Sequence, residues 1–516
     1  MRKLELLDLT NENIERTEIY RNLSDKTQMI RNDDIKGEFT NRFEHTKNVV
    51  ALVEEITKIH NWFEYVDIDR LKLSAKLHDI GHTPFGHAGE DAINALFLSD
   101  DGQHYSENFP GLFKHNINSA RLISERFYVD ESNHILIDSI LKHSNVFPKQ
   151  YNFLVFTEEN IAKINYIFRN INFDNSVFLE KFLIEFNKLK CNKCIKDIKG
   201  KNHIKHCKSK SKLCSCTINN NYKLTDYFLY NAPATIEGTI LLWADEISCF
   251  ISDLYDLLKY IVKYEKNVKS SILMTNMVKN LYLINVYHPE NSIVQHINQC
   301  LNILLEDKFQ TVAIENIKDE LCFLQNYLID NLSLEIDHPS KEIILRENCD
   351  YLISFKNNED LEIFHQFKKS IYSDIHGMKY IKDTNYYGSI AITLLCKVYY
   401  NNFKRFIEDY TKINKLKVES LTWKLCDSIS NLFDDKTNIE DLKKEIENFL
   451  LSLKSLRFTS KKMPLYISRP QQNIDIMIKN LLKREICYFV ATQSEQKVLN
   501  LLKNHKKNVP LPKIKK

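Results

Sequence analysis

Residues 77–90, which read L-H-D-I-G-H-T-P-F-G-H-A-G-E, constrain the fold of this chain more than any other stretch. They hold three histidines, an aspartate and a glutamate, separated by three glycines and a proline. Such helix-breaking residues are rare elsewhere, because the 516 residues contain only 10 glycines and 10 prolines. This distribution predicts long helices around one irregular loop, in which backbone segments approach closely and ionisable side chains converge.

The composition is that of a globular protein, with 43% hydrophobic and 27% charged residues. A length of 516 residues allows two or three domains, or one large helical domain with insertions. The net charge of +3 excludes a strong overall attraction to nucleic acid. Residues 1–10 lack the apolar run of a signal peptide and no window has the length of a membrane span, which predicts a cytoplasmic protein without a membrane partner.

Two predicted helices carry histidines on their apolar faces. In residues 41–60, His45 shares one face with the apolar positions that follow it, so its ring is expected to point inward. In residues 69–80, His78 likewise ends an apolar face, and Asp79 follows at the end of the helix. A hydrogen-bonded core histidine is the alternative for His45, but a second helix that brings His and Asp to the interior makes that alternative less favoured.

A third predicted helix, within residues 233–260, places Asp245 beside Leu241, Leu242 and Trp243. A carboxylate in such apolar company is costly unless it is paired or binds a metal. The alternative is a solvated edge of the helix.

Two imidazoles and two carboxylates are therefore expected to converge, from His45, His78, Asp79 and Asp245. This set of nitrogen and oxygen donors suits a divalent ion such as Mn, Mg, Co or Fe. Such an ion can polarise a phosphate group and lower the pKa of bound water, so no serine or cysteine nucleophile is required.

In this order the four residues match an H…HD…D signature, and the chain resembles the HD-domain metal-dependent phosphohydrolases. It is most similar to the deoxynucleoside triphosphate triphosphohydrolases, the dGTPase-like branch. Five segments support this similarity. Arg42–His45 is similar to the family's R-x-x-H, and residues 78–90 are similar to H-D-I-G-H-P-P-F-G-H-x-G-E. Residues 113–116 are similar to F-E-H-N, residues 244–256 to A-D-D-I-A-Y-x-x-x-D-L-x-D, and residues 20–29 to F-R-R-L-Q-D-K-T-Q-V.

The resemblance implies a fold, a reaction and partners. The pattern predicts an all-α fold with a Cys-rich insertion and a helical C-terminal region, and the resemblance implies that its core is an HD helical core. The reaction would be metal-dependent hydrolysis of a dNTP to the deoxynucleoside and tripolyphosphate. The partners would be the dNTP substrate, an allosteric nucleotide, and further copies of the chain in a tetramer or hexamer.

The resemblance also implies residue roles. His45, His78, Asp79 and Asp245 would bind the metal; His87, Glu90 and His115 would act in catalysis; Arg42 and His82 would contact phosphates; and Asp253 would bind the sugar 3′-hydroxyl.

Two departures from the family pattern fall around the sugar. Ser24 stands where the family has Gln, and Cys249 stands where it has Tyr, so both enter the predicted substrate site with altered chemistry. A late family segment is matched only faintly, over residues 484–494, where both of its aspartates are missing. Sugar choice and base choice are therefore left open.

Residues 151–232 are expected to form an insertion with a cluster of metal-ligand types. The cluster begins with a C-x2-C pair and continues with further His and Cys residues: Cys191, Cys194, His206, Cys207, Cys214 and Cys216. A structural zinc site is one interpretation. Because the spacing fits no standard zinc finger, a basic loop with incidental cysteines is the other.

These patterns divide the chain into four segments. Residues 1–150 form the first part of the HD core and residues 151–232 the insertion. Residues 233–420 form the second part of the core with a helical extension, and residues 421–516 form a C-terminal helical region. The basic tail from Lys503 could bind single-stranded nucleic acid weakly or serve only as a solubilising tail. Two other functions stay open: an HD phosphohydrolase acting on nucleoside monophosphates, cyclic or modified nucleotides, and a non-catalytic nucleotide sensor or nucleic-acid-binding assembly protein.

Overall fold

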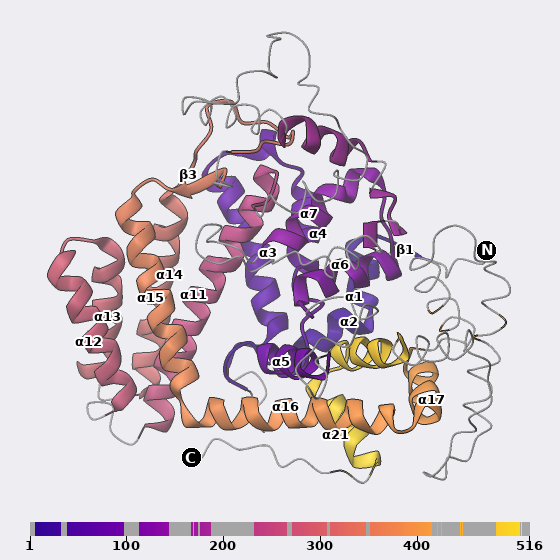
Figure 1. Cartoon of the computed structure of the whole chain (residues 1–516). Coiled ribbons are helices and arrows are strands. Elements are labelled where there is room, and N and C mark those ends of the chain that lie inside the picture. Colours follow the sequence, from indigo (N-terminus) through magenta and orange to yellow (C-terminus); the bar gives the residue numbers. More distant parts are fainter. Residues whose placement is uncertain are drawn as a thin grey trace, which may run out of the picture.

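The computed structural model describes residues 6–31, 39–97, 113–143, 167–168, 170–173, 176–186, 232–265, 271–306, 310–346, 351–414, 421, 425, 444, 446, 481–505 and 507. Over these residues the fold is all-α, as predicted (Figure 1). The strands are two short pairs. β1 (Leu7–Asp8) runs parallel to β2 (Phe127–Tyr128), with Leu7 opposite Phe127. β3 (Leu332–Leu334) runs antiparallel to β4 (Ile353–Phe355), with Leu332 opposite Phe355.

The helices of the N-terminal half surround the loop of residues 78–90. They are α1 (Asn11–Arg16), α2 (Glu18–Arg21), the 3-10 turn η1 (Asn22–Asp25), α3 (Arg42–Ile59), η2 (Phe63–Tyr65), α4 (Ile68–Leu77), α5 (Gly86–Phe97), α6 (His115–Arg126), η3 (Glu131–Asn133) and α7 (His134–Lys142). α3 begins at a capping box, in which the Asn41 side chain accepts from the Glu44 N–H and the Glu44 carboxylate accepts from the Asn41 N–H.

The long helix α11 (Ile236–Tyr264) lies at the centre of the molecule. It packs against α3, α4 and α7 on one side and against α14 and α15 on the other, as Figure 1 shows. Because helices cover it on several sides, most of its side chains are buried, including Trp243 and Phe250. A helix apolar on nearly every face is expected in such a position.

The C-terminal half adds a layer of upright helices and a helix that crosses beneath them (Figure 1). The layer holds α12 (Ile272–Tyr287), α13 (Ser292–Glu306), α14 (Gln310–Asp330) and α15 (Asn358–Gly377), and α16 (Lys379–Tyr400) crosses below, followed by α17 (Phe403–Asn414) and, near the end, α21 (Glu495–Asn504). α16 packs against both α5 and α21, so it joins the helix that begins in the loop of residues 78–90 to the C-terminal segment.

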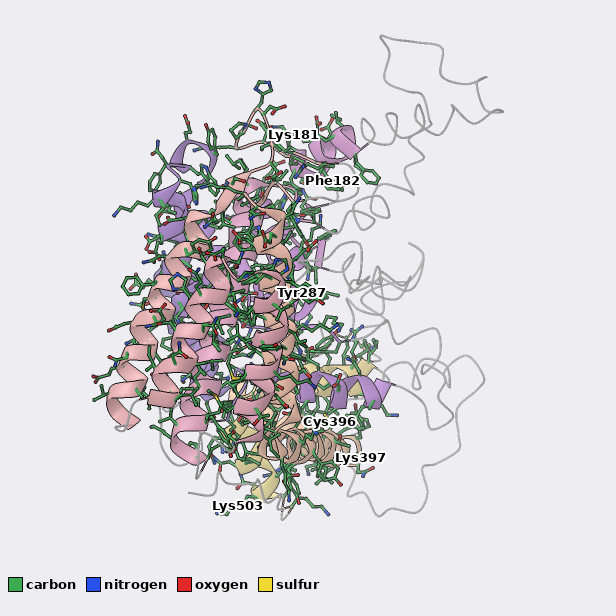
Figure 2. The ribbon with its side chains drawn as sticks, turned by 90° about the vertical axis from the view of Figure 1, so that its left-hand side faces the viewer. Lys181, Phe182, Tyr287, Cys396, Lys397 and Lys503 are labelled. Carbon is green, nitrogen blue, oxygen red and sulfur yellow. The ribbon has the colours of Figure 1, made fainter. Side chains whose placement is uncertain are left out.

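Part of the segment predicted as an insertion packs into the core. Residues 177–186 are helical, and Phe178 and Phe182 are buried in the same cluster as the side chains of α6 and α7. Lys142 lies over the ring of Phe182. Figure 2 shows Lys181 and Phe182 at the end of the molecule away from Lys503. In the parts of the chain that the structure describes, no helix has the length and apolarity that crossing a membrane requires.

Candidate metal centre and catalytic loop

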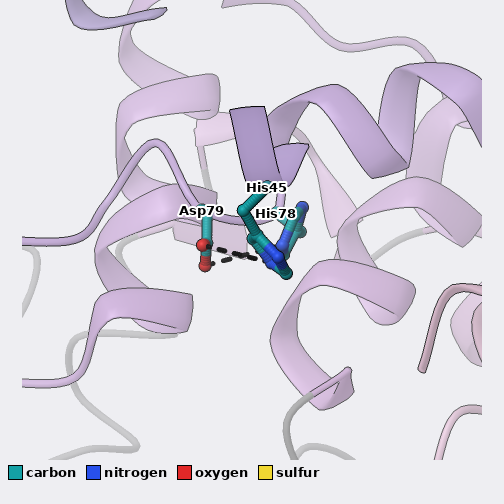
Figure 3. Close-up of side chains that lie close together, drawn as sticks. All are labelled: His45, His78 and Asp79. Atoms are coloured by element: carbon teal, nitrogen blue, oxygen red, sulfur yellow. Dashed lines mark ion pairs between the residues drawn. The ribbon is translucent and has the colours of Figure 1, made fainter. Parts of the chain in front are cut away.

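The four predicted metal ligands converge from two helices, α3 and α11, and from the turn after α4, as Figure 3 shows for three of them. Nε2 of His45 lies 2.9 Å from Oδ1 of Asp245 and 3.9 Å from Oδ2 of Asp79. Nε2 of His78 lies 3.6 Å from Oδ1 of Asp79 and 3.6 Å from Oδ1 of Asp245. Atoms that bind one ion at about 2.0–2.3 Å are separated by roughly 3.0–3.7 Å, so the spacing fits a shared metal ion.

Neighbouring groups orient both imidazole rings. Nδ1 of His78 donates to the carbonyl of Ala75 at 2.7 Å, and Nδ1 of His45 lies 3.2 Å from the hydroxyl of Ser248. These contacts leave Nε2 of each ring facing the carboxylates, which is the arrangement found around protein-bound metals. Nε2 of His78 is fully buried, and no group among the described residues hydrogen-bonds to it. A divalent cation would satisfy that nitrogen.

The charge balance also calls for a cation. Burial favours protonation of Asp79 and Asp245, but the imidazoles around them hold the pKa of each carboxyl well below its ordinary value. Burial lowers the pKa of His78, yet these two carboxylates outweigh it and raise that pKa to about 9. In the absence of a metal, a proton on His78 therefore supplies the positive charge that the carboxylates require.

The turn after α4 places adjacent residues in one site. α4 ends at Leu77, earlier than the expected end at residue 80, and His78 and Asp79 begin a turn. Consecutive residues of a helix point about 100° apart, whereas a turn can aim both side chains at one point. A Cβ on Gly81 would lie 2.2 Å from the carbonyl oxygen of His115, so only glycine allows this close packing of the turn on α6.

Arg42 and His82 both contact the carboxylate of Asp79. Nη1 of Arg42 donates to Oδ2 at 2.6 Å, and Nε2 of His82 lies 3.2 Å from Oδ1. The two predicted phosphate contacts therefore border the metal ligands directly. The ring of His82 also stacks on that of His115, with centroids 3.7 Å apart.

A second cluster is built around the carboxylate of Glu90. Its Oε1 accepts from the backbone N–H of His115 at 2.8 Å and lies 2.8 Å from Nδ1 of the same residue. Its Oε2 lies 3.1 Å from Nδ1 of His87. Burial favours the protonated acid, but the two histidines hold the pKa of Glu90 well below its ordinary value. An ionised carboxylate thus orients two imidazoles, and the His87 side chain is half exposed.

The residues predicted around the sugar differ in their surroundings. Asp253 is buried on α11, where burial and the nearby Asp256 raise the pKa of its carboxyl well above the ordinary value. The sulfur of Cys249 lies 3.6 Å from Oδ1 of Asp245. The hydroxyl of Ser24 donates to the carbonyl of Arg21 within its own turn. The predicted zinc cluster, with Cys191, Cys194, His206, Cys207, Cys214 and Cys216, lies outside the described residues.

His143 belongs to this region and was not predicted from the sequence. Its Nδ1 lies 2.7 Å from the carbonyl of Ile140, and its ring centroid lies 5.1 Å from that of His78. With His78 and Asp245 it forms a further group of closely spaced ligand atoms. The only sequence signal was a histidine directly after a helix rich in leucine and isoleucine.

A row on α15 was also missed. Lys368, Tyr372 and His376 follow at four-residue spacing and so share one face of the helix. Lys368 forms an ion pair with Glu246, the neighbour of Asp245. Burial, together with the charge of Asp253, raises the pKa of Tyr372, and burial, together with the charge of His87, lowers that of His376. The spacing K-x-x-x-Y-x-x-x-H was visible in the sequence, but nothing there linked it to the site.

Comparison with known proteins finds similarity around this site. Residues 42–170 match the model of the HD domain. A deoxyguanosinetriphosphate triphosphohydrolase-like protein of Thiobacillus denitrificans is 34% identical over 131 residues, covering 24% of this chain and 31% of that protein. One of Pelagibacter ubique is 30% identical over 167 residues, covering 31% of this chain and 40% of that protein. The similarity therefore spans less than half the length of these relatives.

The matched region contains α3 with His45 and the loop of residues 77–90 with His78 and Asp79, whereas Asp245 lies outside it on α11. The predicted resemblance is confirmed: this chain carries an HD domain and is similar to the deoxyguanosinetriphosphate triphosphohydrolase-like proteins.

Proposed function

We propose that this chain is a metal-dependent phosphohydrolase that converts deoxynucleoside triphosphates to deoxynucleoside and tripolyphosphate. The observation that carries this proposal is the position of the Glu90 cluster beside the four convergent ligands. The two clusters meet where His82, in contact with Asp79, stacks on His115. A metal centre next to an oriented pair of imidazoles is suited to hydrolysis of a phosphate ester.

His45, His78, Asp79 and Asp245 would hold the divalent ion. When bound, the ion supplies Lewis acidity toward a phosphate oxygen and lowers the pKa of a bound water. Asp79 also receives the Arg42 guanidinium and the His82 imidazole, so its carboxylate fixes the edge of the site that faces the substrate phosphates. Charge-assisted contacts of this kind suit the highly charged triphosphate group.

The Glu90 cluster would handle the protons of the reaction. Glu90 fixes Nδ1 of both His87 and His115, which leaves the other ring nitrogen of each to exchange a proton with the substrate. Water attack at the α-phosphorus breaks its bond to the nucleoside 5′-oxygen, and that oxygen must take up a proton as it leaves. An imidazole held by a buried carboxylate is a suitable donor.

The α15 row, Lys368, Tyr372 and His376, would add to the substrate site. Burial lowers the pKa of Lys368 to about 8, so near neutral pH it is largely protonated and can neutralise phosphate charge. Tyr372 and His376 present a ring pair with centroids 4.1 Å apart, which suits contact with a sugar or base. Asp253, near Tyr372, carries a carboxyl group that can hydrogen-bond a sugar hydroxyl.

The proposal is tested by incubating the full chain with each dNTP and NTP in Mn²⁺, Mg²⁺ or Co²⁺ and measuring both nucleoside and tripolyphosphate. We expect equal amounts of the two products from at least one dNTP. Release of orthophosphate alone would refute the proposed cleavage and favour the alternative HD phosphohydrolases.

Two variants separate metal binding from proton transfer. Asp79→Ala is expected to lose both bound metal and turnover, whereas Glu90→Gln should keep the metal and lose about 100-fold in turnover. Glu12→Gln, at an exposed ion pair on α1, is the control and should match the unaltered protein. Full turnover in Asp79→Ala would contradict the assignment of the metal centre.

A further inference from the structure

Cys249 lies within the donor set of the metal centre. It follows Asp245 by one turn of α11, and its Sγ lies 3.6 Å from Oδ1 of Asp245 and 4.0 Å from Nε2 of His45. The ligand atoms of these three residues all lie within 4.8 Å of one another. Sulfur binds zinc at about 2.3 Å, so a sulfur and an oxygen on one ion are separated by roughly 3.1–3.7 Å. The distance from Cys249 to Asp245 falls in this range.

An independent observation points to the same carboxylate oxygen. Nε2 of His78 is fully buried and has no hydrogen-bond partner in the described part of the chain, although it faces Oδ1 of Asp245 at 3.6 Å. The same oxygen atom thus has the sulfur of Cys249, Nε2 of His78 and Nε2 of His45 around it. One ion beside Oδ1 would reach all three.

We propose that Cys249 coordinates the metal ion as a thiolate, which gives this centre a sulfur ligand besides its histidines and aspartates. The inference rests on the metal centre of the proposed function and concerns its chemistry. As the sulfur–metal bond forms, the S–H bond breaks and the proton passes to the solvent. A sulfur donor favours Zn²⁺, Co²⁺ or Fe²⁺ over Mg²⁺. The tyrosine of the family motif supplies no such donor.

A neighbouring amide is placed to support a sulfur ligand. A thiol that coordinates a divalent cation is deprotonated. The amide of Gln28, with Nε2 3.6 Å from the sulfur, lies close enough to donate to a thiolate.

The test is a Co²⁺ titration of the full chain after removal of metals with a chelator. We expect visible ligand-field bands that His78→Ala abolishes, and a near-ultraviolet sulfur-to-cobalt band that Cys249→Ser abolishes while the visible bands remain. Cys322→Ser, at an exposed cysteine on α14, is the matched control. A Cys191→Ser, Cys194→Ser double variant identifies any sulfur band that arises from residues 191–216.

Cd²⁺ and Mg²⁺ affinities give a second measurement. Loss of even an outer-shell partner costs about 10–100-fold in metal affinity, so Cys249→Ser should bind Cd²⁺ at least about tenfold more weakly and leave Mg²⁺ binding unchanged. Cys249→Ala should behave in the same way, and circular dichroism checks that both variants fold.

Three outcomes of these measurements distinguish the sulfur ligand from the metal centre itself. Loss of the near-ultraviolet band and of Cd²⁺ affinity in Cys249→Ser supports it. If Cys249→Ser matches Cys322→Ser while His78→Ala still removes the visible bands, the thiolate ligand is refuted and the metal centre stands. If His78→Ala changes no band, both the metal centre and its sulfur ligand are refuted.

Discussion

His45 depends on a residue that the HD motif does not include. Its Nε2 faces Asp245, and its Nδ1 contacts Ser248, which lies on the same helix less than one turn further on. The hydroxyl of Ser248 can accept the Nδ1 proton and thereby keep Nε2 unprotonated for the metal. His45 is thus supplied by α3, and Ser248, which fixes the tautomer of its ring, is supplied by α11.

We therefore expect Ser248→Ala to weaken metal binding by about 10–100-fold, the usual cost of losing such a supporting hydrogen bond. Secondary structure should not change, because alanine fits the same helical position. Ser252→Ala is the matched control one turn later, where the hydroxyl only donates to the carbonyl of Cys249. Calorimetric titration with Mn²⁺ measures the difference; equal affinities in the two variants would contradict this role of Ser248.

The sequence was informative for single residues whose environment is local. His45, His78 and Asp245 could be placed in the interior because each lies on an apolar helical face, and the structure brings them together. His143 and the α15 row could not be found in this way. Their approach to the site depends on how helices far apart in the sequence pack, and helical periodicity carries no information about that.

At the scale of elements, the C-terminal segment closes over the loop of residues 82–85. The side chain of Glu495, the first residue of α21, accepts from the backbone N–H of Thr27 at 2.8 Å and of Phe85 at 3.1 Å. Nε of Arg31 lies 3.3 Å from its other oxygen. Phe85 has a φ of 62°, a strained conformation for a residue with a bulky side chain, so this hydrogen bond helps to hold it.

Replacing Glu495 by alanine should leave the buried N–H of Phe85 and the part-buried N–H of Thr27 without their acceptor, and the loss of a buried partner costs about 1–3 kcal/mol. We expect Glu495→Ala to lower the free energy of unfolding by roughly 2–4 kcal/mol and to reduce turnover, because the loop beside the metal ligands loosens. Gln496→Ala is the control, since the bond of Gln496 to Asp25 uses its backbone N–H and its side chain makes only an exposed hydrogen bond to Asn500. Urea unfolding measures the change, and similar stabilities would contradict the role of Glu495.

The link between the two ends of the chain explains a faint sequence signal. The late family segment was barely recognisable over residues 484–494, yet this region packs on the N-terminal motif. The side chain of Asn22 donates to the carbonyl of Thr492 at 2.9 Å, and Nζ of Lys26 lies 3.5 Å from the carbonyl of Ala491. Several of these contacts use the backbone, so the side chains could change while the packing was kept.

For the whole molecule, the all-α class followed from the scarcity of glycine and proline, but the assembly of the helices did not. The central position of α11 is set by contacts with helices on both sides, from segments before and after it in the chain. A tetramer or hexamer, an allosteric nucleotide and a nucleic-acid contact of the basic tail stay predictions. The zinc cluster does so as well.

The pH dependence of folding offers a test at this scale, because buried ionisable groups of opposite sign lie in the N-terminal half. Burial raises the pKa of Asp256 on α11 from 3.8 to about 7, although the backbone N–H of Thr40 donates to it at 2.9 Å. Burial lowers the pKa of Lys26 from 10.5 to about 7. The folded state therefore favours the neutral form of each group.

The two groups act on stability in opposite directions. A raised carboxyl pKa gives stability that is full below about pH 4 and is lost as the pH rises through 7, because the unfolded chain releases its proton first. A lowered lysine pKa gives stability that is full above about pH 10.5 and is lost as the pH falls through 7. In the unaltered protein, the change of the free energy of unfolding with pH is therefore the difference between these two contributions. Single variants are needed to measure each group separately.

Asp256→Asn keeps an oxygen that can accept from Thr40 but cannot ionise. We expect it to stabilise the protein by roughly 2 kcal/mol more at pH 8 than at pH 5, because only the aspartate must be buried as an anion at the higher pH. Asp319→Asn, at an exposed position on α14, should show no such difference. Urea unfolding of the three proteins at both pH values decides the matter. An equal effect of Asp256→Asn at pH 5 and pH 8 would mean that this carboxyl already ionises in the folded protein at pH 5, and that the burial of α11 does not govern its charge.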